Sequence, residues 1–88
     1  MTGLPGQDLI AAGLADLANG VESAAALLVA IGSPRLRDLG LTVPPTPEHP
    51  EHRLYALLAA ENADAAHGRY NALVRRFVSF ERALACAS

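Results

Sequence analysis

Four arginines near the carboxyl end of the chain have the spacing most suggestive of a binding surface. Arg69 and Arg76 are seven residues apart, as are Arg75 and Arg82. On a helix each pair therefore shares one edge of the same face. None of the four has an acid three or four residues away, so ion pairs within the helix cannot neutralise them. Each must face water, an acid on another element, or a partner molecule.

Two phenylalanines in the same stretch indicate what the rest of this helix does. Phe77 and Phe80 share one stripe with Leu73 and Leu84, at the spacing of a core-facing helix. They are expected to be buried and not to alternate with the arginines as platforms for stacked bases. The stretch is therefore predicted to be an amphipathic helix whose polar face is rich in unpaired arginine.

The short stretch SPRLRDLG adds two more candidate arginines, Arg35 and Arg37. Glu81 falls beside the apolar stripe of the last helix, where a carboxylate normally has a partner. Arg35 or Arg53 is expected to supply it.

Histidines and carboxylates cluster in PEHPEH, which places Glu48, His49, Glu51 and His52 together. Imidazole and carboxylate are metal ligands. The spacing matches no established site, however, and a proline separates the histidines. A solvated helix start, without metal, is the favoured interpretation.

Catalytic groups are sparse. Cys86 has no histidine nearby in sequence, and Ser33 is better explained as a helix cap. No glycine-rich phosphate loop, CxxC pair or HExxH occurs. We therefore expect a non-catalytic protein that uses no cofactor.

The elements that carry these residues are predicted to be helices, because alanine and leucine dominate a composition that is 51% apolar and only 5% aromatic. Apolar residues recur at three and four in residues 7–18, and Asn19-Gly20 is a stop signal. Residues 22–31 are apolar on nearly every side, which is typical of a buried helix. Residues 34–39 form a short helix with Ser33 as its cap.

A proline-rich connector divides the chain. After a lead at residues 1–6 come a helical half at 7–40, the connector at 41–50 and a second helical half at 51–87. Asn62 or Asp64 is expected to cap a last helix at about 64–86. The fold class is all-α, a single domain of four main helices and one short helix, as a compact bundle or an intertwined homodimer.

The bulk properties narrow the function. The formal charge of −2 argues against a general polyanion binder, and the single cysteine and the absence of a long apolar run favour a cytoplasmic protein without a membrane span. We expect an interaction or regulatory protein, such as an adaptor or antitoxin-like regulator, that binds a protein partner or itself. The alternative is a nucleic-acid-binding regulator whose dimer joins several arginines into one basic band, namely Arg35, Arg37, Arg75 and Arg82.

Overall fold

The computed structural model describes residues 3–87, and within that range the chain is helical with no strand. The helices are α1 (Gln7–Ala18), α2 (Ala24–Ile31), α3 (Ser33–Asp38), α4 (Pro50–Glu61) and α5 (Ala66–Ala87). The predicted all-α bundle of four main helices and one short helix is confirmed.

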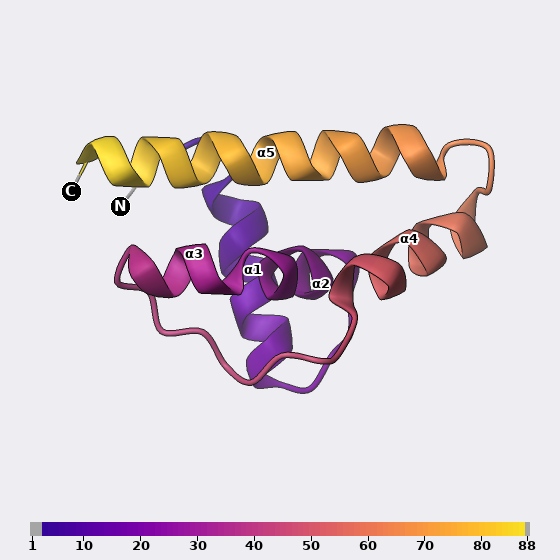
Figure 1. Cartoon of the computed structure of the whole chain (residues 1–88), viewed down its shortest axis with the longest axis horizontal. Coiled ribbons are helices and arrows are strands. Elements are labelled where there is room, and N and C mark those ends of the chain that lie inside the picture. Colours follow the sequence, from indigo (N-terminus) through magenta and orange to yellow (C-terminus); the bar gives the residue numbers. More distant parts are fainter. Residues whose placement is uncertain (1–2, 88) are drawn as a thin grey trace.

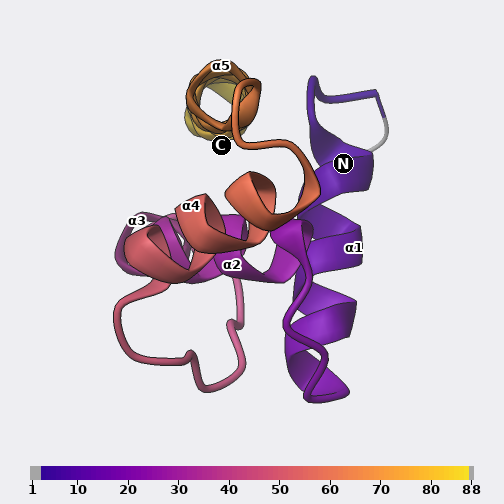
Figure 2. The ribbon, with the colours of Figure 1, turned by 90° about the vertical axis from the view of Figure 1, so that its right-hand side faces the viewer.

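The helices are arranged around α2. Helices α3, α2 and α4 follow one another beneath the long α5, and α1 crosses them steeply (Figure 1). A view turned by 90° shows α5 nearly end-on above this layer and α1 standing beside it (Figure 2). The connector between α3 and α4 runs along the side of the molecule opposite α5 (Figure 1). The molecule therefore has two distinct outer faces, one formed by α5 and one by the connector.

Helix α2 is the centre of the core. All residues from 26 to 30 are buried, as its all-round apolar sequence predicts. The helix begins at Ala24 and not at 22, because Ser23 caps it. The Ser23 hydroxyl accepts a hydrogen bond from the Ala26 amide at 3.1 Å and donates one to Asp16 at 2.6 Å. This cap therefore also ties the start of α2 to the end of α1.

The junction between α2 and α3 corrects one prediction. Ser33 is the first residue of α3 and makes no capping hydrogen bond; Gly32 precedes the helix. The Gly32 amide donates to the Leu28 carbonyl at 3.2 Å, and its own carbonyl accepts from the Leu36 amide at 3.0 Å. Gly32, and not Ser33, therefore occupies the N-cap position of α3, and glycine has no side chain with which to cap the first turn. A Cβ atom at Gly32 would overlap the ring of Phe77, so this junction also seats α5.

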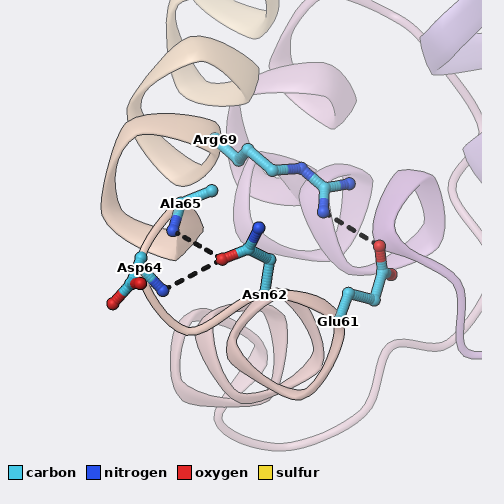
Figure 3. Close-up of polar contacts among 5 residues, drawn as sticks. All are labelled: Glu61, Asn62, Asp64, Ala65 and Arg69. Atoms are coloured by element: carbon cyan, nitrogen blue, oxygen red, sulfur yellow. Dashed lines mark hydrogen bonds and ion pairs between the residues drawn. The ribbon is translucent and has the colours of Figure 1, made fainter.

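The turn between α4 and α5 depends on Asn62. Its side-chain oxygen accepts hydrogen bonds from the amides of Asp64 at 3.1 Å and Ala65 at 3.2 Å (Figure 3). Asn62 was one of the two predicted caps, but the residues it holds form a turn, so α5 begins at Ala66 and not at 64.

The apolar stripe of α5 faces the core as predicted. Phe77, Phe80 and Leu84 are buried. Among residues 3–87 the only exposed large apolar side chains are Val21 and Tyr55, which are 50% and 42% exposed. One chain therefore covers nearly all of its large apolar side chains within the described residues, and the homodimer stays a prediction. None of the described helices is long and apolar enough to cross a membrane.

Candidate functional site

Arg69 belongs to the structure of the α4–α5 turn. Its guanidinium lies 2.9 Å from the Glu61 carboxylate at the end of α4 (Figure 3). Both side chains are about half exposed, so the pair is worth well under 1 kcal/mol. The sequence placed Arg69 on the candidate surface, and the structure shows that it already has a partner.

Arg35 supplies the partner that Glu81 was expected to have. The Arg35 Nε lies 3.4 Å from a Glu81 carboxylate oxygen, which joins α3 to α5. Arg53, the other candidate, instead pairs with Glu22 at 2.8 Å.

Within residues 3–87, Arg37 makes a single weak contact. One of its guanidinium nitrogens donates to the Val43 carbonyl at 3.4 Å, which ties the start of the connector to α3. Its side chain is exposed, so it remains able to contact a partner from the side of α3.

Arg75, Arg76 and Arg82 differ from the other arginines. All three are exposed on α5, and no acid within residues 3–87 pairs with them. We call these three residues the arginine surface. Arg76 lines a cavity of about 280 Å³ beside the start of α1, together with Asp8, but the two form no ion pair. The arginine surface is where uncompensated positive charge is concentrated.

Half-buried valines lie beside the arginine surface. Val74 and Val78 are both half-buried. They lie beside the buried apolar stripe of α5 that contains Phe77 and Phe80. Val78 is three residues after Arg75 and four before Arg82, so it lies between them on one side of the helix. This part of α5 therefore combines two charged side chains with accessible apolar area.

The other candidate groups form no cluster. Within residues 3–87, no three His, Cys, Asp or Glu side chains are placed to hold a metal ion, and PEHPEH forms the largely exposed entry to α4. Cys86 is a free, exposed thiol. The predictions of no metal and no catalysis remain predictions.

The sequence did not indicate a cavity that forms beneath the connector. It has a volume of about 260 Å³, and its lining comes from the turn between α1 and α2, from one or two residues each of α1, α2 and α4, and from two prolines of the connector. Val21 lines this cavity and directly follows Asn19-Gly20, the predicted end of the first helix. The exposure of a residue in a turn between helices depends on which other segments of the chain pack against it. Periodicity carries no signal for this kind of site.

The chain matches no protein-family model, no curated protein and no solved structure.

Proposed function

We propose that this chain is a non-catalytic interaction protein that binds an acidic surface of a protein partner through the arginine surface of α5. The observation that carries the proposal is the unequal pairing of the arginines. Three of the seven have an acid on another part of the chain, and a fourth donates to a backbone carbonyl. The three that have neither within residues 3–87 all lie on α5.

An unpaired, exposed guanidinium is well suited to recognition. It stays charged at all physiological pH values and presents planar donors that match a carboxylate in two-point contacts. Arginine is also enriched in protein interfaces and in the residues that dominate their binding energy. Three such groups on one rigid helix give a partner several anchor points without any rearrangement of the chain.

A protein partner fits this surface better than nucleic acid does. The arginine surface is divided between two edges of α5, with Arg76 on one and Arg75 and Arg82 on the other. Backbone binding to nucleic acid needs several positive charges in one patch. The accessible apolar area of Val74 and Val78 suits the interior of a protein interface. The free thiol of Cys86 supports a reducing compartment such as the cytoplasm.

The alternative is a nucleic-acid-binding regulator with an arginine band completed by dimerisation. It is favoured by the proximity of α3 to α5, since the Arg35–Glu81 ion pair brings Arg35 beside the arginine-bearing helix. The two functions differ in their salt dependence. Binding through phosphates weakens steeply as salt rises, in proportion to the number of contacts.

The test compares the wild-type protein with a triple variant, Arg75→Gln, Arg76→Gln and Arg82→Gln. Partners captured from cell extract on immobilised wild-type protein are identified, purified and titrated by calorimetry. We expect the triple variant to bind at least about tenfold more weakly, as several charge-assisted contacts are lost. The control is Arg69→Gln, which removes an arginine that is already paired and should change the affinity by less than about threefold.

Duplex DNA of random sequence, followed by fluorescence anisotropy, tests the alternative directly. Micromolar binding that falls steeply between about 50 and 200 mM salt, and that the triple variant abolishes, would replace the protein-binding proposal. If the triple variant and the wild type bind the captured protein partner with equal affinity, the protein-binding proposal is refuted.

A further inference from the structure

The cavity beneath the connector is built to receive an aliphatic side chain. Its apolar walls come from Leu17 of α1, Leu27 of α2, and Pro45 and Pro47 of the connector. Its volume of about 260 Å³ is below the range of roughly 300–1,000 Å³ that is typical of sites for drug-sized ligands. One or two aliphatic side chains are of the right size.

The two charged side chains that line this cavity pair with each other. Arg53 forms an ion pair with Glu22 at 2.8 Å and also donates from Nε to the Glu48 carbonyl at 2.8 Å. The two prolines on the wall have no amide hydrogen to offer. The leucine, alanine, valine and proline side chains of the lining therefore favour an apolar occupant in the body of the cavity.

A side chain of the required type lies at the edge of the same cavity. Val21 lines the cavity and is 50% exposed, which makes it the most exposed large apolar side chain within residues 3–87. An exposed valine and a cavity that fits an aliphatic side chain are thus neighbours on one surface. Two copies related by a two-fold axis meet through the same patch, so such a patch must carry both a knob and a hole.

The charges at the edge have the same self-complementary character. Glu22 and Arg53 are adjacent, of opposite sign and 46% and 48% exposed. When a second copy is rotated by 180° onto this surface, the carboxylate of each chain can face the guanidinium of the other. The two copies can then attract each other through two Glu22–Arg53 contacts, one on each side of the two-fold axis.

We propose that the chain forms a two-fold homodimer through this surface, with Val21 of each copy inserted into the cavity of the other. The arginine surface of α5 is unsuited to this role, because a two-fold axis through it would bring like charges together. The connector and the end of α1, which contribute lining residues to the cavity, lie on the side of the molecule away from α5 (Figure 1). In this dimer the two α5 helices lie on opposite outer sides, far from the two-fold axis.

The dimer keeps its two arginine surfaces apart. Each lies on one outer side, so they are not joined into one basic band. The dimer is expected to be weak. A standard interface covers about 800 Å² of each partner, roughly one sixth of the 5115 Å² surface of this chain, and a contact centred on one valine and one cavity is smaller than that. A dissociation constant in the micromolar range is the expected result for a smaller contact.

The test is sedimentation equilibrium of the full chain over a wide concentration range. Val21→Ser should raise the dimer dissociation constant at least about tenfold, because two inserted side chains are lost per dimer. Val21→Leu, which fills the cavity further, should lower it. Tyr55→Ala is the matched control, since it removes the other exposed large apolar side chain and should leave the dissociation constant unchanged. Thermal melts show whether each variant is folded.

The position of α5 in the dimer provides a second measurement. A spin label is placed at Ser79, an exposed position near the middle of α5, by Ser79→Cys in a Cys86→Ser background. The proposal places the two labels on opposite outer sides of the dimer. It therefore requires a distance between the labels greater than 24 Å, which is the middle one of the three overall dimensions of a single chain. Packing of α5 on α5 would give less than about 20 Å, because packed helix axes lie about 8–10 Å apart. A monomer at all concentrations, a short label distance, or an unchanged dissociation constant for Val21→Ser would each overturn the proposal.

Discussion

Gly32 is a position at which a single added methyl group should be strongly destabilising. Its backbone has φ of −89°, which alanine adopts freely, so Gly32→Ala introduces no backbone strain. The obstacle is packing. The added Cβ would meet three atoms of the Phe77 ring at distances far inside van der Waals contact. Phe77 is only 7% exposed, so the ring cannot move aside without disturbing the core.

The cost can be set against a matched glycine in the same chain. Overpacking a core typically costs about 1–3 kcal/mol, and the depth of this overlap places Gly32→Ala near the top of that range. Gly68 lies on an exposed side of α5, where an added methyl group would meet only open space, so Gly68→Ala should stabilise the fold by about 0.5–1 kcal/mol. In a domain of this size each kcal/mol shifts Tm by roughly 4–8 °C, so the two variants should melt more than about 10 °C apart.

The assay is urea denaturation followed by circular dichroism, in the wild-type and Phe77→Leu backgrounds. Leucine lacks the ring atoms that the new Cβ would meet, so Gly32→Ala should cost at least about 1 kcal/mol less in that background. If Gly32→Ala costs the same in both backgrounds, or leaves stability within about 0.5 kcal/mol of the wild type, then α5 is not seated on the α2–α3 junction as described.

Two further predictions concern polar contacts. Ser23→Ala should lower the free energy of unfolding by about 1 kcal/mol, because it removes the cap of α2 and the link to Asp16; urea denaturation checks it, and a cost below about 0.3 kcal/mol would contradict the capping role. A double-mutant cycle with Arg35→Gln and Glu81→Gln should give a coupling below about 1 kcal/mol that vanishes in about 1 M salt, and a larger coupling insensitive to salt would show that the pair is shielded from solvent.

The sequence determined the elements whose signals are local. Apolar residues recurring at three and four predicted α1, an all-round apolar stretch predicted the burial of α2, and the stripe through Phe77 and Phe80 predicted the core face of α5. Boundaries were less accurate where the signal was a single polar residue. Ser33 was the predicted cap, but Gly32 occupies the N-cap position and Ser33 is the first residue of the helix.

The tertiary structure decided which of the candidate arginines are still available to a partner. Spacing along one helix showed that Arg69 had no acid in its own helix, but its pairing with Glu61 depends on how the turn at Asn62 folds α5 back over α4. The cavity beside Val21 likewise exists because the connector returns across α1 and α2. Helix periodicity is fixed by neighbours a few residues away, whereas ion pairs between helices and cavities between segments are fixed by the packing of the whole chain.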